Sequence, residues 1–278
     1  MFKDVLVHVP TERALRPIVD GSVSLAATYG LHLDALAVGY VSTSAAYVME
    51  GGAAVAAVFE IERENAMERA KAALEVFEAE AKNAGIAYSC RPIGAIPAEA
   101  AASVGATARL YGLCIVLQPE PEQGSFDNTL PQEILFQAGG PVLFLPHIFR
   151  GAFKAKRIGI CWDGSRVAAR ALKDAMPFLA KADELTIITV NEAESVPAEV
   201  SAANLTKHLA RSGLTSKTIA LSGARSEIQP MILSLAADEG LDMLVMGGYG
   251  HSRLQESFLG GVTRAMLETM TVPTLMSH

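Results

Sequence analysis

Short apolar runs along the chain alternate with longer segments in which apolar residues recur every three or four positions. The short runs are typical of buried strands, and the longer segments are typical of helices that pack on them. The first run, residues 5–9, precedes a helical pattern at about residues 13–29. Strands that alternate with helices predict a parallel sheet covered on both faces, because the crossover connections are right-handed.

This order of elements occurs twice. We expect strands at residues 5–9, 33–38, 87–93, 113–117 and 141–145, and again at 158–162, 185–190, 216–221, 243–246 and 273–277. The repeat predicts an α/β protein of two tandem, doubly wound, Rossmann-like domains with five-stranded parallel sheets. The expected domains are residues 1–150 and 151–278, with residues 151–156 as the linker.

The two last strands begin with Pro141 and Pro273. Pairing them edge to edge would satisfy the open backbone groups of both sheets. We therefore expect the domains to form a pseudo-dimer within one chain, and two chains could assemble further into a homodimer.

The first half carries an insertion. The numbering offset between equivalent positions falls from 153 at Pro10 and Asp163 to 129 at Leu117 and Met246, so about 24 residues are extra. They lie at 41–64 and run into a long helix. Its apolar stripe is expected to face the core or the other domain, through Ile61, Met67, Leu74, Phe77 and Ala81.

Composition narrows the class of protein. Of 278 residues, 50% are hydrophobic and 19% charged, which excludes a mainly disordered chain. No apolar run approaches the ~20 residues of a membrane helix, and residues 1–9 do not resemble a signal peptide. The three cysteines have neither disulfide nor zinc spacing. We expect a cytoplasmic protein with no membrane partner.

Charge is distributed unevenly. The net charge is −7, and a chain without a basic surplus is not expected to bind nucleic acid. Residues 1–150 hold 17 acidic and 10 basic residues, whereas residues 151–278 hold 13 of each. An anionic ligand therefore fits the second half better.

Candidate chemistry follows the strands of the second half, because ligands bind beyond the carboxyl ends of a parallel sheet. The first strand runs into Asp163-Gly164-Ser165, and the fourth into Met246-Gly247-Gly248-Tyr249-Gly250. Gly260-Gly261-Val262-Thr263 then opens the last helix. Glycines allow close backbone approach to a ligand, and a helix start offers free N–H groups to phosphate. This spacing predicts a loop that wraps a di- or triphosphate.

The Gly-x2-Gly-x9-Gly pattern, with Asp-Gly-Ser after the first strand, resembles the universal stress protein family, as a tandem of two domains over nearly the whole chain. The resemblance implies an adenine-nucleotide α-hydrolase-like fold and a stress-response or signalling protein that binds ATP, ADP or AMP, with or without Mg. It implies that Asp163 and Val190 hold adenine and ribose and that Met246 packs on the base. The phosphate loop would be shaped by Gly247, Gly250, Gly260 and Val262.

Two departures from the family pattern matter. Gly261 stands where ATP-binding members carry Ser or Thr, so a phosphate-contacting hydroxyl is missing, and Ser252, Arg253 or Thr263 are the residues that could replace it. In the first half, Pro10 replaces Asp163, and residues 118–121 replace the glycines. Prolines lack N–H donors, and Glu120 would repel phosphate. We expect no nucleotide in that half.

Other interpretations stay open. Residues 247–250 could form a tight strand exit without a ligand, and Asp163 could simply cap a helix. The chain could be an interaction module with decayed pockets, or a weak nucleotide hydrolase. A P-loop, metal-ligand spacing and a catalytic triad are not recognisable in the sequence, so dedicated catalysis is not expected.

Overall fold

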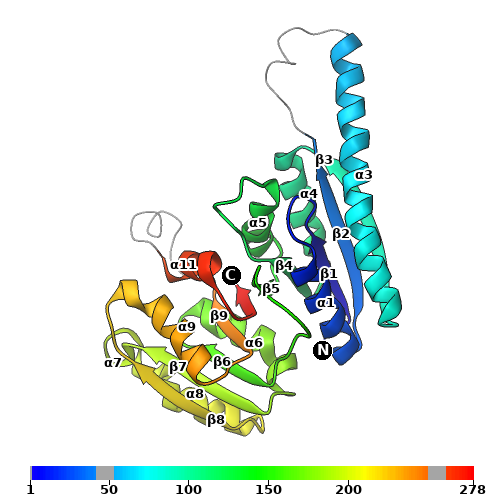
Figure 1. Cartoon of the computed structure of the whole chain (residues 1–278). Helices are drawn as coiled ribbons and strands as arrows, with labels where there is room; N and C mark the ends of the chain where they lie inside the picture. Colours follow the sequence, from blue (N-terminus) through cyan, green and yellow to red (C-terminus); the bar gives the residue numbers. More distant parts are fainter. Residues whose placement is uncertain (1, 42–52, 250–260) are drawn as a thin grey trace. The chain divides into compact units, whose positions relative to one another are not determined.

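The computed structural model describes residues 2–41, 53–249 and 261–278, and strands alternate with helices as predicted (Figure 1). The strands are β1 (Asp4–Val9), β2 (His32–Tyr40), β3 (Ala87–Ala95), β4 (Leu113–Leu117), β5 (Val142–Leu145), β6 (Arg157–Cys161), β7 (Glu184–Val190), β8 (Ser216–Leu221), β9 (Met243–Gly247) and β10 (Thr274–Ser277). The α-helices are α1 (Arg16–Tyr29), α3 (Ala53–Asn83), α4 (Pro97–Ala108), α5 (Leu130–Gln137), α6 (Arg166–Leu179), α7 (Glu192–Ser195), α8 (Ala202–Arg211), α9 (Ile228–Asp238) and α11 (Val262–Thr269). Short 3₁₀ helices are η1 (Phe126–Asn128), η2 (Ala198–Val200) and η3 (Arg225–Glu227).

The chain forms two compact units. One comprises residues 2–138 and 150–153, and the other comprises residues 139–149 and 154–278. Strand β5 belongs to the second unit because it pairs antiparallel with β10, with Leu143 opposite Leu275. The predicted pairing of the two last strands is therefore confirmed, whereas a domain boundary at residue 150 stays a prediction.

In the first unit the strand order is β3-β2-β1-β4, and the neighbours are parallel. Helix α3 packs on β2 and β3 (Figure 1). Three residues of its predicted stripe, Leu74, Phe77 and Ala81, are buried, but Ile61 is 56% exposed. The expectation was wrong for Ile61, because α3 continues past the strands on which its later turns pack (Figure 1).

In the second unit the order is β5-β10-β9-β6-β7-β8, parallel except at β5. The chain runs outward from β6 to β8 and then returns to β9 on the other side of β6. Right-handed crossovers therefore put α6 and α8 on one face and α9 and α11 on the other. The direction in which the chain adds strands to the sheet therefore reverses between β6 and β9. At such a point, open parallel sheets form a crevice at their carboxyl end.

Glycines follow the ends of two helices. Gly85 follows α3 with φ of 64°, and Gly213 follows α8 with φ of 77°. Such left-handed backbone strains residues with a Cβ, so glycine is the preferred stop. In the described part of the chain, the helices are too short or too polar to cross a bilayer.

Candidate functional site

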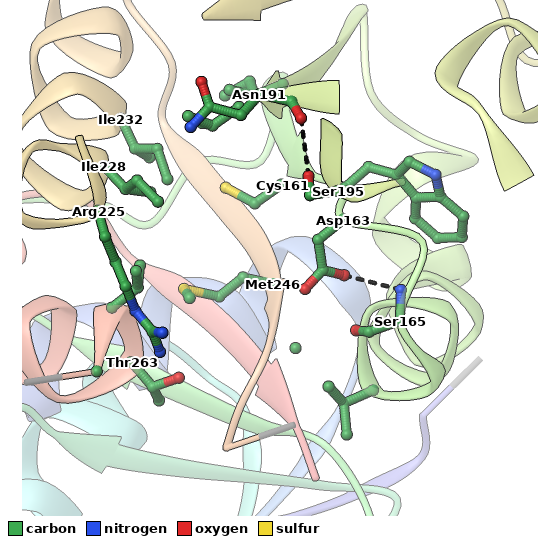
Figure 2. A pocket seen from close by; sticks show the side chains of 17 residues that line it. Cys161, Asp163, Ser165, Asn191, Ser195, Arg225, Ile228, Ile232, Met246 and Thr263 are labelled. Carbon is green, nitrogen blue, oxygen red and sulfur yellow. Dashed lines mark hydrogen bonds between the residues drawn. The ribbon is translucent and has the colours of Figure 1, made fainter. Parts of the chain in front are cut away.

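A cavity of about 420 Å³ opens at the carboxyl ends of β6, β7 and β9 (Figure 2). Small-molecule sites usually measure roughly 300–1,000 Å³, and they favour this position in open α/β sheets. Its walls come from loops that follow four strands and from α9 and α11. The cavity is lined by Cys161, Trp162, Asp163, Ser165, Val167, Ile188, Val190, Asn191, Ser195, Arg225, Ile228, Ile232, Met246, Gly247, Gly261, Val262 and Thr263.

Seven of the ten residues predicted for the site meet here, although they are spread over about a hundred positions of sequence: Asp163, Val190, Met246, Gly247, Gly261, Val262 and Thr263. Gly250, Arg253 and Gly260 lie outside the described residues, as does Ser252. Their predicted part in a phosphate loop therefore stays a prediction.

The loop after β6 fixes the Asp163 carboxylate. Its Oδ1 accepts a hydrogen bond of 2.9 Å from the backbone N–H of Ser165 (Figure 2). The Ser165 hydroxyl in turn accepts from the N–H of Ala168 at 3.2 Å and caps α6. Gly164 makes the turn with φ of 69°. Asp163 is thus a local anchor, and the other carboxylate oxygen has no hydrogen-bond partner among the described residues.

Trp162 forms part of the wall and is held in place. Its indole N–H donates to the carbonyl of Val200 at 2.7 Å, and the residue is only 7% exposed. Cys161 lies next to it in the chain, and burial, with a smaller effect of the Asp163 charge, raises the pKa of its thiol to about 12. The thiol is therefore protonated at neutral pH and is not an activated nucleophile.

Asn191 joins the ends of β7 and β8. Its side-chain amide donates to the carbonyl of Gly223 at 2.8 Å and accepts from the Gly223 N–H at 3.1 Å. Its backbone is left-handed, with φ of 52°, and its carbonyl accepts from the Ser195 hydroxyl at 2.9 Å (Figure 2). Neither Asn191 nor Ser195 was predicted as a site residue from the sequence. The one available signal was the tolerance of Asn for a left-handed backbone.

The exit of β9 is tightly packed. A Cβ on Gly247 would lie 2.6 Å from the Val167 side chain and 2.7 Å from the backbone of Ala168, so only glycine fits. Two residues on, Tyr249 also has a left-handed backbone, and its N–H donates to the Thr263 hydroxyl at 3.2 Å. Gly247 thus has a packing role whether or not a ligand binds.

Helix α11 begins at the cavity. Gly261 is its N-cap in an extended conformation, with φ of −69° and ψ of 146°, and offers no side-chain cap. The first N–H groups of a helix lack partners within the helix and carry partial positive charge. This end of the cavity therefore favours an anion.

Arg225 supplies the one basic side chain among the described lining residues. It stands at the start of η3, and Figure 2 shows its guanidinium directed toward Thr263 on α11. Asp163, the one acidic lining residue in the described part, lies on the opposite side with Met246 between them (Figure 2). The cavity is thus acidic at one end, basic at the other end and apolar between them.

The geometry defines an α/β protein with a cleft of about 420 Å³ at the switch point of its C-terminal sheet. Residues 154–278 match the model of the universal stress protein family. This segment makes up just under half of the chain, and it is similar to that family.

Among curated proteins, a universal stress protein of Methanocaldococcus jannaschii is 34% identical over 73 residues, which are 26% of this chain and 43% of that protein. The match thus spans less than half of the curated relative. Some solved structures match the whole fold. A universal stress protein from Archaeoglobus fulgidus superposes with a TM-score of 0.73 at 16% identity, covering 98% of this chain and 97% of that one.

A candidate universal stress protein from Pseudomonas aeruginosa superposes with a TM-score of 0.60, also at 16% identity, covering 99% of this chain and 93% of the other. At these identities the likeness shows a shared fold. It confirms the predicted α/β fold with tandem domains. A universal stress protein solved in complex with cAMP is 21% identical, covering 44% of this chain and 97% of that one, with a TM-score of 0.34.

Proposed function

We propose that the C-terminal unit binds an adenine nucleotide, ATP, ADP or AMP, as part of a stress-response or signalling function in the cytoplasm. The observation that carries this proposal is the polarity of the cavity, with a carboxylate at one end and a helix start and a guanidinium at the other. A nucleotide has the matching polarity, because its ribose hydroxyls donate hydrogen bonds and its phosphates are anionic.

The apolar middle of the cavity suits a flat base. Met246 is 6% exposed, and Val190, Ile228 and Ile232 surround the same space. A thioether is polarizable and adapts to an aromatic surface. The base would therefore lie against Met246, with the ribose toward Asp163.

The phosphates would meet the first turn of α11. Backbone N–H groups at Val262 and Thr263 and the charge of Arg225 can stabilise phosphate oxygens without the missing hydroxyl at Gly261. Binding through backbone donors predicts modest affinity. A bound Mg²⁺ would have to be coordinated mainly by phosphate oxygens and water, because Asp163 is the one carboxylate in the described lining.

Titration with ATP, ADP and AMP tests the proposal, with Trp162 fluorescence and calorimetry as readouts. Trp162 is the only tryptophan and lines the cavity, so we expect a saturable fluorescence change. The decayed-pocket alternative predicts none by either method. Nucleotide hydrolysis that disappears in Asp163→Ala would instead favour the weak hydrolase.

The variant Arg225→Gln tests whether the phosphates bind at the Arg225 end of the cavity. A hydrogen bond to a charged group is worth about 1.5–3 kcal/mol, so ADP affinity should fall roughly tenfold or more while adenosine affinity stays unchanged. Arg211→Gln is the matched control, because Arg211 is an exposed arginine at the end of α8 and does not line the cavity. Equal effects on ADP and adenosine would contradict the assigned direction of the ligand.

A further inference from the structure

The segment that follows the first strand differs between the two halves of the chain. By the offset of 153, Pro10 occupies the position of Asp163, and Thr11 and Glu12 occupy those of Gly164 and Ser165. In the C-terminal half, the Asp163 carboxylate accepts the N–H of Ser165. Pro10 has no carboxylate, so the N–H groups after β1 need another acceptor.

Asp127 provides that acceptor from η1, 116 positions along the chain from Thr11. Its Oδ2 accepts hydrogen bonds of 2.9 Å from the backbone N–H groups of Thr11 and Glu12. Its Oδ1 accepts from the Tyr40 hydroxyl at 3.0 Å. The side chain is completely buried, so the carboxylate replaces solvent at the carboxyl ends of β1 and β2.

Neighbouring groups are also satisfied from within the chain. The Thr11 hydroxyl donates to the carbonyl of Val38 at 2.6 Å. The strand registers make Val38 the counterpart of Val190, which lines the C-terminal cavity. Val190 lines the cavity in one half, whereas the carbonyl of its counterpart Val38 accepts a side-chain hydrogen bond in the other.

The segment that carries Asp127 is itself fixed. Glu12 Oε2 accepts hydrogen bonds from the Ser125 hydroxyl at 3.0 Å and the Phe126 N–H at 2.8 Å. The Ser125 hydroxyl also accepts from the Asp127 N–H at 3.1 Å, and the rings of Phe126 and Tyr40 lie 5.5 Å apart. Asp127 is therefore held over the strand ends from two sides.

Two further titratable groups, His8 and Arg13, lie near the carboxylate beside Tyr40. His8, the counterpart of Cys161, places Nε2 at 3.6 Å from Asp127 Oδ1 without a hydrogen bond. Burial lowers the pKa of His8 and raises the pKa of Tyr40, so His8 is neutral and Tyr40 is a donor. Arg13 is buried as well and lies 3.3 Å from Glu120. Of these groups, Tyr40 donates a hydrogen bond to Asp127, and the neutral His8 adds no positive charge beside it.

We propose that the N-terminal half contains an anion site filled by the chain's own Asp127. The ligand class is a carboxylate held by the N–H groups of Thr11 and Glu12 and by the Tyr40 hydroxyl. An external small carboxylate is excluded while Asp127 is present and binds once that side chain is removed. This proposal does not depend on whether the C-terminal cavity binds a nucleotide.

Chemical rescue tests it. In full-length Asp127→Ala, formate should raise the melting temperature saturably by several degrees, because a ligand that binds only the folded state stabilises it. Chloride at the same ionic strength should not. Asp127→Asn is the matched control, since its amide fills the space and leaves no room for formate. Wild type should also show no rescue.

A folded Asp127→Ala protein that formate does not stabilise overturns the proposal, as does equal stabilisation of wild type. If Asp127→Ala folds poorly, amide exchange in wild type decides. The N–H groups of Thr11 and Glu12 should exchange slowly, although they lie in a loop, because the buried carboxylate holds them. Exchange at the rate of a free loop would refute an occupied site.

Discussion

Replacing Gly261 by Ser tests how the missing hydroxyl limits the site. Gly261 is the N-cap of α11, and its φ of −69° and ψ of 146° suit a serine without strain. As a cap, serine gains only a few tenths of a kcal/mol over glycine. A serine hydroxyl that donates to a phosphate oxygen is worth more, about 1.5–3 kcal/mol. We therefore expect Gly261→Ser to bind ADP roughly tenfold tighter, or better.

Calorimetric titration of wild type, Gly261→Ser and Gly261→Ala with ADP measures this effect. Alanine adds the Cβ without the hydroxyl, so it separates backbone stiffening from the phosphate contact. Adenosine should bind all three proteins equally. The reasoning is refuted if serine leaves ADP affinity unchanged, or if alanine tightens binding as much as serine does.

Two further predictions concern the N-terminal half. Gly39→Ala should lower the free energy of unfolding by about 1–3 kcal/mol or more, because the added Cβ would overlap the carbonyl of Ala66 on α3. Gly94→Ala is the control and should be tolerated, because the nearest atom to its added Cβ lies at 3.6 Å. Equal denaturation midpoints for the two variants would contradict this prediction. For His8, burial lowers the pKa, the nearby Asp127 charge raises it and Arg13 lowers it. The unfolded chain therefore binds the extra proton, and stability should fall below pH 6.5 by at most ~1.4 kcal/mol per pH unit. Urea titrations from pH 5 to 7 should show a shallower fall in His8→Gln, and an unchanged slope would refute the assignment.

Much of the fold could be predicted because it depends on local pattern. Strand β8 and strand β4 have the bounds expected from their apolar runs, and the glycines after α3 and α8 end those helices. The 3₁₀ helix η1 and helix α5 were missed, because the polar, proline-containing segment before them has no clear periodicity. Ile61 was placed wrongly because periodicity does not reveal where the neighbouring sheet stops.

One part of the candidate site could also be predicted from the sequence, and another part could not. Asp163, Val190 and Met246 follow or end successive strands, so strand order alone brings them to one edge. Arg225 lies at the cavity because of how η3 is oriented against α11, which no motif encodes. Asp127 reaches Thr11 across 116 positions, and only the folded chain shows this contact.

The function proposed for this protein depends on an adenylate binding in the cleft between Asp163 and α11. A crystal structure of the full chain grown with saturating ADP tests it most directly. We predict density for the base against Met246 and for phosphate oxygens within hydrogen-bond distance of the Val262 N–H and the Arg225 guanidinium. A cleft that stays empty, or that the chain's own side chains fill, would contradict the account.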